Sequence, residues 1–528
     1  MNNIKGAIAL FVVLALGIGA YKFLYPILQE RRQLSTSDAS GMKGTIKLAL
    51  DNWIGYYILQ SAEMKRLMRN SGWNLVVEDD KANYAEREER LRKREIDFAV
   101  ATVDSDILNG APKGFPAVWI AVIDVSKGGD AILSCTGKIS NLNAIKGRND
   151  LKIAFTPSSP SHHLLKATAD HFGIPELLVK NQNRVETDGS EEALKMCLSG
   201  KADIAVLWEP AVSRALEEGK GKITKLLGTE STERLIVDIL TASRTFVDNN
   251  PEAVRTLLAN YFLALKLYRD QLELLKKEIV EETKLSGKKL SPEAVDKMLK
   301  GVKWMTLEDN AKLWFGLSTA DGRSEDGLLM TAESTVRILI ASKDFSKNPI
   351  PEGNPARLIN SKFIEELHKG AFSPGFTVPG AKTNGTPANS QGARFTPLDE
   401  AGWNSLKEVG TLKIRSITFR RSSSVLTEDG KEELNILAEQ IKHYPAFRIL
   451  LPGHSGLAGD PDENKKLSQE RAEAAAKYLE VTFSIDPNRM RAVGFGSEKP
   501  LTRISGETDE SYNFRLPRVE IILVREVL

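Results

Sequence analysis

Residues 46–57 read Ile-Lys-Leu-Ala-Leu-Asp-Asn-Trp-Ile-Gly-Tyr-Tyr, and this stretch decides the fold of the first module. Its first five residues form a short apolar run that is typical of a buried strand. Residues 55–69 then predict a helix, and residues 73–78 predict a second strand. A strand, a helix and another strand in succession indicate an α/β unit.

The same alternation continues along the chain. Further short apolar runs, which predict strands, lie at residues 96–102, 117–123, 152–155 and 204–207. Helical segments separate them, so the pattern predicts an open α/β sheet. From residue 251 to about residue 299 apolar side chains recur at helical spacing, as at Val254, Leu257 and Leu258.

The composition limits the class of protein. A chain of 528 residues exceeds one hydrophobic core, because single cores stop growing near about 250 to 300 residues. The 72 Lys and Arg residues nearly balance the 70 Asp and Glu residues, so a nucleic-acid partner is not indicated. Cys135 and Cys197 allow at most one disulfide, which leaves the compartment open.

The N-terminal segment predicts contact with a membrane. Residues 6–28 carry a single charge, Lys22, and are long enough as a helix to cross a hydrocarbon layer of about 30 Å. Residues 17–20 match a signal-peptidase site poorly, which favours an uncleaved anchor over a cleaved signal. We therefore expect a transmembrane helix in residues 1–28, followed by a linker in residues 29–44.

The second half of the chain predicts a linker and a smaller domain. Residues 371–400 are rich in Pro and Gly, which is typical of a linker. Beyond them, residues 401–528 predict an α+β domain. Its expected strands are residues 414–419, 447–451, 491–495 and 519–524, and its expected helices are residues 428–442 and 464–479.

Candidate ligand-binding residues follow from the α/β pattern, because such sheets bind ligands beyond the carboxyl ends of their strands. They are Asn52, Trp53, Tyr56, Thr102, Ser158, Ser159, Trp208 and Glu209. The two tryptophans could instead be core residues, and Glu209 could merely cap or salt-bridge the rim of the cleft. Ser159 is an expected N-cap with Pro160 at the first helical position, and the free amides there would favour an anionic group.

These residues carry a resemblance to a known family. The motifs Asp51-Asn52-Trp53-Ile54-Gly55 and Asp203-Ile-Ala-Val-Leu-Trp-Glu-Pro210 resemble the periplasmic solute-binding proteins of the nitrate, sulfonate, taurine and thiamine-precursor ABC transporter class. The resemblance implies a type II fold over residues 45–370, with two α/β lobes, two crossovers and a ligand between the lobes.

Catalytic and metal chemistry are not indicated. His162 and His163 are adjacent, and neighbours on a helix point about 100° apart, so they cannot both hold one ion comfortably. The iron-binding cysteine motif of the similar thiamine-pyrimidine synthases, a nucleophile elbow, a P-loop and a His-Glu-x-x-His motif are all missing from the sequence. We expect neither enzymatic activity nor a cofactor.

The C-terminal residues resemble the OmpA-like peptidoglycan-binding family. The resemblance lies in Leu451-Pro-Gly-His-Ser455, in Asn464 with Leu467-Ser-Gln-Glu-Arg-Ala472, and in residues 489–501. It implies peptidoglycan binding through Arg471, Asn464 and Arg518. The aspartate that the family uses against diaminopimelate is Gly456 here, so the fold could also survive as a protein-interaction domain.

Together these expectations describe a receptor anchored in the inner membrane, with its bulk in the periplasm. It would bind a small anionic or zwitterionic solute and associate with peptidoglycan, and an inner-membrane permease or envelope complex is a possible partner. The alternative is an envelope scaffold or sensor with a degenerate cleft and no wall binding.

Overall fold

The computed structural model describes residues 42–179, 182–285, 290–317, 326–370, 395–420 and 422–526. The expected transmembrane segment and residues 371–394 of the expected linker lie outside these ranges. Within them, none of the helices combines the length and the apolar character needed to cross a bilayer.

The first lobe is built on a six-stranded sheet with the order β11-β4-β10-β3-β1-β2. Strand β1 pairs in parallel with β2 and β3, whereas β10 is antiparallel to both β3 and β4. The strands are β1 (Gly44–Leu50), β2 (Trp73–Asp79), β3 (Phe98–Thr102), β4 (Ala117–Ser126), β10 (Val237–Ser243) and β11 (Val302–Trp304).

The second lobe repeats this design in a five-stranded sheet with the order β7-β6-β8-β5-β9. Here β5 is the antiparallel strand, between β8 and β9. The strands are β5 (Asp130–Ser134), β6 (Ile153–Phe155), β7 (Arg184–Glu186), β8 (Ile204–Trp208) and β9 (Thr224–Gly228). Each lobe therefore receives one strand from a chain segment that returns from the other lobe, as the type II topology requires.

Helices cover both sheets. Those of the first lobe are α2 (Tyr57–Gln60), α3 (Ala62–Asn70), α4 (Tyr84–Lys93), α5 (Val103–Gly110), α9 (Arg244–Asn249), α10 (Pro251–Asp270), α11 (Leu272–Leu285), α12 (Pro292–Lys300), α13 (Leu307–Asp309), α14 (Gly327–Ala341) and α15 (Lys362–His368). The second lobe has α6 (Pro160–His171), α7 (Ser190–Leu198) and α8 (Ala211–Glu218). The single helix expected over residues 55–69 is interrupted at Ser61, whose hydroxyl caps α3 by accepting the amide of Met64 at 3.1 Å.

Two crossovers join the lobes, one from β4 to β5 and one from β9 to β10. The hydroxyl of Thr229, in the second crossover, binds the amides of Gly128 and Asp130 in the first, each at 3.0 Å. It also lies 2.8 Å from the hydroxyl of Ser126. This one buried side chain therefore links both crossovers at the hinge.

The third sheet belongs to the C-terminal region and has the order β12-β16-β13-β14, with β15 beside β13. Its strands are β12 (Lys407–Thr411), β13 (Arg448–His454), β14 (Met490–Gly494), β15 (Arg518–Val519) and β16 (Ile522–Arg525). Its helices are α16 (Glu400–Ser405), α17 (Glu428–Lys442), α18 (Pro461–Phe483) and α19 (Asp509–Arg515).

The expected opening strand at residues 414–419 is wrong, because the opening strand is β12, which precedes it. Ile417 is buried, but the carbonyl of Thr418 accepts the amide of Thr427 at the start of α17 and not that of a neighbouring strand. The apolar residues that alternate in this segment therefore pack beneath a helix and do not form a strand of the sheet.

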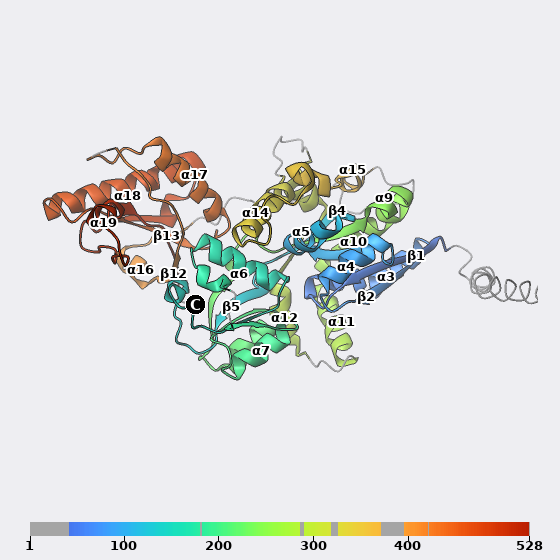
Figure 1. The fold of residues 1–528 in the computed structure, drawn as a ribbon. Coiled ribbons are helices and arrows are strands. Elements are labelled where there is room, and N and C mark those ends of the chain that lie inside the picture. The colour runs from blue at the N-terminus through green and yellow to red at the C-terminus, as the bar shows by residue number, and fades with distance from the viewer. Residues whose placement is uncertain are drawn as a thin grey trace, which may run out of the picture.

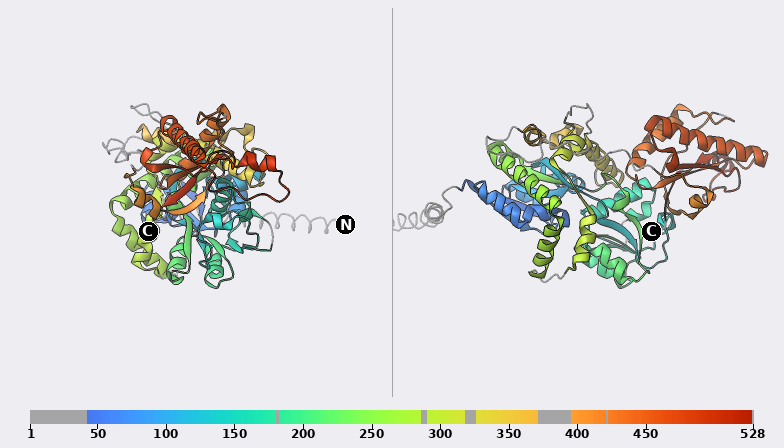
Figure 2. Two further views of the ribbon diagram at one scale, coloured as in Figure 1. Left: turned by 90° about the vertical axis from the view of Figure 1, so that its left-hand side faces the viewer. Right: turned by 180° about the vertical axis from the view of Figure 1, so that it is seen from behind.

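The C-terminal sheet packs against the second lobe. Figure 1 shows α17 and α18 on the far side of α6 from β1 and β2, and the view from behind in Figure 2 agrees. Buried side chains of both parts form one continuous cluster, which includes Phe172 after α6 and Tyr444 after α17. The amide of Lys413 also donates to the carbonyl of His171 at 2.7 Å.

Candidate functional site

The residues expected to bind a ligand have different positions at the junction of the lobes. Trp53, Tyr56, Thr102, Ser159 and Glu209 are buried there. Ser158 and Trp208 are half-buried, whereas Asn52 is exposed.

Trp53 crosses from the first lobe to the hinge. Its side chain is only 7% exposed, and its indole nitrogen donates to Oδ1 of Asp124 at 3.2 Å. A Cβ atom on Gly129, in the first crossover, would overlap the Trp53 ring. The glycine therefore lets the indole lie directly on the hinge backbone, where an opening of the lobes would uncover it.

Register places three polar side chains in one row across the first sheet. Asp238 on β10 lies opposite Thr102 on β3 and opposite Asp124 on β4. Directly opposed residues of antiparallel strands share a face, so these three side chains point the same way. Tyr56 adds a hydroxyl that donates to Oδ1 of Asp238.

The carboxyl groups of this row, and the nearby Asp130, have raised pKa values. Burial raises the pKa of Asp124 to about 7, against the donors and neighbours that surround it. Burial also raises the pKa of Asp238 well above its ordinary value, and the nearby Asp124 raises it further. Asp130, at the start of β5, has its pKa raised by burial to about 7 although the hydroxyl of Ser126 donates to it at 2.7 Å.

Asp124, Asp130 and Asp238 were not among the residues expected from the sequence. Asp124 and Asp238 each interrupt an apolar run, Val-Ile-Asp-Val at 122–125 and Val-Asp-Ile-Leu at 237–240. A lone acid within a buried strand was the available signal, because charged residues are seldom buried without a partner.

The second lobe contributes the start of α6. Ser159 is the N-cap as expected, and its hydroxyl accepts the amide of His162 at 3.4 Å. The ring of His162 turns back and accepts the amide of Ser158 at 3.2 Å. His163 is buried, and burial lowers its pKa.

Glu209 and Trp208 end β8. Both oxygens of Glu209 are held by Ser213, through its amide at 3.0 Å and its hydroxyl at 2.7 Å. The helix-capping role that the sequence left open for Glu209 is therefore present. Trp208 lies opposite Asp130 on β5 and packs against the apolar core of the first lobe, so it helps to close the lobes.

The candidate wall-binding residues lie in the C-terminal region. Arg471 on α18 donates from Nε to the carbonyl of Ser423 at 3.0 Å, and its guanidinium lies 5.3 Å from the centre of the Phe419 ring. Burial lowers the pKa of Arg471. A Cβ atom on Gly456 would meet no atom within 4 Å, so this position accepts a side chain.

Asn464 and Arg518 have local structural partners. Asn464 donates to the carbonyl of Ala458 at 3.0 Å and so holds the loop before α18. Arg518 donates to Glu520 at 2.6 Å and to the carbonyl of Leu516 at 3.0 Å. Both residues therefore shape the loops around Gly456 whether or not they touch a ligand.

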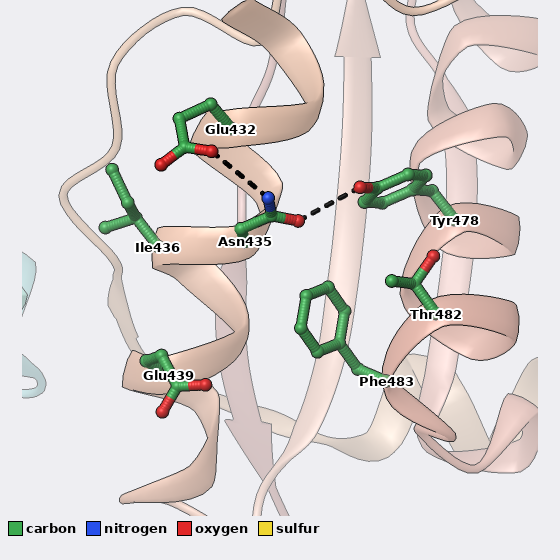
Figure 3. Close-up of a pocket in the computed structure, with 7 residues that line it drawn as sticks. All are labelled: Glu432, Asn435, Ile436, Glu439, Tyr478, Thr482 and Phe483. Carbon is green, nitrogen blue, oxygen red and sulfur yellow. Dashed lines mark hydrogen bonds between the residues drawn. The ribbon is translucent and has the colours of Figure 1, made fainter. Parts of the chain in front are cut away.

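A separate groove of about 520 Å³ lies between α17 and α18 (Figure 3). Its lining residues are Glu432, Asn435, Ile436, Glu439, Tyr478, Thr482 and Phe483. The Tyr478 hydroxyl donates to Asn435 at 3.0 Å across its floor, so α17 and α18 are fastened together there. Among the described residues, no group of three or more His, Cys, Asp or Glu side chains could hold a metal ion.

Comparisons with known proteins agree with this division of the chain. Residues 418–514 match the OmpA family. The chain is 31% identical over 99 residues to the peptidoglycan-associated lipoprotein of Brucella melitensis. The aligned residues are 19% of this chain and 58% of that protein. It is 33% identical over 108 residues to the probable lipoprotein YiaD of Escherichia coli, covering 20% of this chain and 48% of that protein.

Among solved structures, the aliphatic sulphonate binding protein SsuA of Escherichia coli superposes with a TM-score of 0.45 at 18% identity. The superposition covers 60% of this chain and 98% of that chain. The chain combines two α/β lobes, whose strand orders are those expected for a type II binding fold, with a C-terminal region in which residues 418–514 match the OmpA family.

Proposed function

We propose that this protein is an envelope receptor that captures a small solute between its two lobes and is held at the cell wall by its C-terminal domain. The observation that carries the proposal is the junction of the lobes. Aromatic and carboxyl side chains from both sheets are buried there, against a hinge that Thr229 links. An inter-lobe junction of this kind is where ligands of such folds bind.

The location is supported by the disulfide and by the OmpA match. Cys135 and Cys197 form a disulfide between the end of β5 and α7, and disulfides persist in oxidising compartments such as the periplasm. The relatives with the OmpA domain include peptidoglycan-associated lipoproteins, which supports a place at the wall. We also propose that residues 6–28 anchor the chain in the inner membrane, where a permease could accept the solute.

Binding without catalysis is part of the proposal. Hydroxyls beside the buried carboxyls are already engaged, because that of Tyr56 donates to Asp238 and that of Ser126 donates to Asp130. Thr102 and Ser105 bind one another at 2.9 Å and cap α5.

A scaffold with no wall binding remains the second candidate, and the wall site supplies the observation that favours it. The guanidinium of Arg471 is partly used by Ser423, and the carboxylate of the family pattern is replaced by Gly456. A charge-assisted hydrogen bond contributes about 1.5 to 3 kcal/mol, so its loss weakens wall binding substantially.

Thermal unfolding of the full chain in a mild detergent tests the receptor function. The panel of solutes contains sulfonates, nitrate, amines and pyrimidines. A solute present at about 100 times its Kd adds about 2.7 kcal/mol to the stability of the native state. A solute that raises the melting temperature, and fails to do so after Trp53→Phe, supports the receptor. If the whole panel leaves the melting temperature unchanged, the scaffold takes its place.

A further inference from the structure

Buried carboxyl groups gather where the lobes meet, and they outnumber the cations around them. Asp104, Asp124, Asp130, Asp238 and Glu209 are all buried there. The one fully buried arginine of this region, Arg87, is committed elsewhere, because it pairs with Asp51 at 3.3 Å and with Asp80. Burying a carboxylate is costly unless a cation or hydrogen-bond donors compensate it.

Asp124 and Asp238, which face one another, have few hydrogen-bond donors in the described part of the chain. Asp124 is fully buried, and its Oδ2 finds no N–H or O–H donor among the described residues. Asp238 accepts the hydroxyl of Tyr56 and faces Asp124, with which it shares a hydrogen bond while one of the two carboxyl groups is protonated. A group with several N–H donors and a positive charge would satisfy both carboxylates at once.

An independent observation comes from the other lobe. His163 on α6 is 2% exposed, and its Nδ1 has no hydrogen-bond partner among the described residues. The charge of Asp104, at the start of α5 in the first lobe, acts on this ring and opposes the effect of burial on its pKa. An unpaired ring nitrogen there can accept a further N–H.

The start of α6 is less suited to an anion than its sequence predicts. The amide of His162 is taken by Ser159, and the amide of Ser158 is taken by the ring of His162. Two donors that would bind an anionic group are therefore already used. Trp53 and Trp208 lie beside Asp124 and Asp130, and aromatic rings attract cations.

Resting on the receptor function proposed above, we infer that the solute carries a protonated amine, and that its ammonium group binds against Asp124 and Asp238 on the first lobe. Trp208 of the second lobe packs against the first lobe beside Asp130, so the lobes close around this group. The ligand class is a small organic amine, and an anionic group is not required.

The ionisable groups that face the pair belong to several elements. They are Asp51, Asp130, Tyr56 and Tyr261, and Asp104 and Glu209 act in turn on Asp130. The carboxyls among them add negative charge when they ionise. Amine binding therefore strengthens as the pH rises from about 5.5 to 8, while the amine itself stays protonated.

The test uses the full chain with putrescine and choline as amine probes, ethanesulfonate and nitrate as anion probes, and magnesium chloride as a metal probe. We expect an amine to raise the melting temperature, with a larger shift at pH 8 than at pH 5.5. Asp124→Asn and Asp238→Asn should weaken amine binding at least tenfold by isothermal titration calorimetry. Asp248→Asn, an exposed acid of the same lobe, is the matched control and should bind like the native protein.

A measurement without ligand guards against unfolded variants. Asp124→Asn should raise the melting temperature of the ligand-free protein at pH 8, because its amide donates to Asp238 and removes the repulsion between two carboxylates. Stabilisation by ethanesulfonate, nitrate or magnesium alone overturns the amine inference and leaves the receptor function standing. Unchanged amine binding in both Asn variants overturns the assignment of the site, and a response to none of these probes overturns the inference as well.

Discussion

His443 of the C-terminal domain is hydrogen-bonded to Glu233 of the second crossover in both directions. Its Nδ1 lies 3.0 Å from the carbonyl oxygen of Glu233, and the amide of Glu233 donates to its carbonyl at 2.8 Å. The ring also stacks on His171 of α6 with centroids 5.4 Å apart. The C-terminal domain is thus attached to the hinge that joins the lobes.

Acid should weaken this attachment. Burial lowers the pKa of His171 well below 6.5, and His443 lowers it further, while burial also lowers the pKa of His443. A histidine with a lowered pKa contributes stability that is complete above its unfolded value and is lost as the pH falls below about 6.5. We expect the free energy of unfolding to fall by about 1 kcal/mol or more between pH 7 and pH 5, since each unit of pKa difference corresponds to about 1.4 kcal/mol.

Urea unfolding of the full chain at several pH values measures this loss. His171→Gln should flatten the pH dependence, and His368→Gln, at a half-buried histidine that pairs with Glu308 outside this interface, should leave most of it in place. An equally steep loss in His171→Gln would show that the interface histidines are not its source.

Gly129→Ala should hold the lobes apart. The added methyl group would overlap the Trp53 ring, which lies on the hinge backbone. Small-angle X-ray scattering should report a larger radius of gyration, and solute binding should weaken. Adding Trp53→Ala should restore the native radius because it removes the overlap. A double variant as open as the single one would contradict this account of closure.

Gly456→Asp should strengthen binding to peptidoglycan. The position has room for a side chain and its backbone is not in the left-handed region, so an aspartate there can meet an ammonium group while Arg471 meets a carboxylate. Pelleting with purified peptidoglycan measures the effect, and Gly456→Asn is the uncharged control. Arg471→Ala should reduce pelleting. If native protein and Gly456→Asp both remain in the supernatant, the domain serves another partner.

Removing the disulfide should destabilise the second lobe. The bridge spans 62 residues of sequence, and closing a loop of that size stabilises the folded state by about 4 kcal/mol. Cys135→Ser with Cys197→Ser should therefore lower the free energy of unfolding by about 2 to 4 kcal/mol, measured with urea. Dithiothreitol should lower the native protein to the same level. Equal stability of reduced and oxidised protein would argue against the bridge.

Residues 6–28 should remain attached and leave the rest of the chain in the periplasm. Both folded parts resemble exported proteins, so we expect protease added to spheroplasts to digest the chain. A cytoplasmic protein in the same cells should survive as the control. A mature chain that begins near Tyr21 and is released by osmotic shock would identify a cleaved signal instead.

Local pattern in the sequence determined the two α/β lobes and the C-terminal α+β domain. The β1 strand, the cap at Ser159 and helix α17 depend on neighbours a few residues away, so apolar spacing and capping residues specify them. Residues 414–419 show where local pattern fails. Their alternation of apolar and polar residues is the same whether the segment pairs as a strand or packs beneath a helix.

The pairing of distant residues was decided only by the tertiary structure. Asp124 and Asp238 are far apart in sequence, and each is the lone acid of an otherwise apolar run, which does not say what it faces. They face one another because the chain leaves the first lobe after β4 and returns as β10 between β3 and β4. The contact of His443 with Glu233 has the same origin. Strand order and domain packing depend on long-range contacts that local spacing does not encode, and those contacts set the charge of the candidate site.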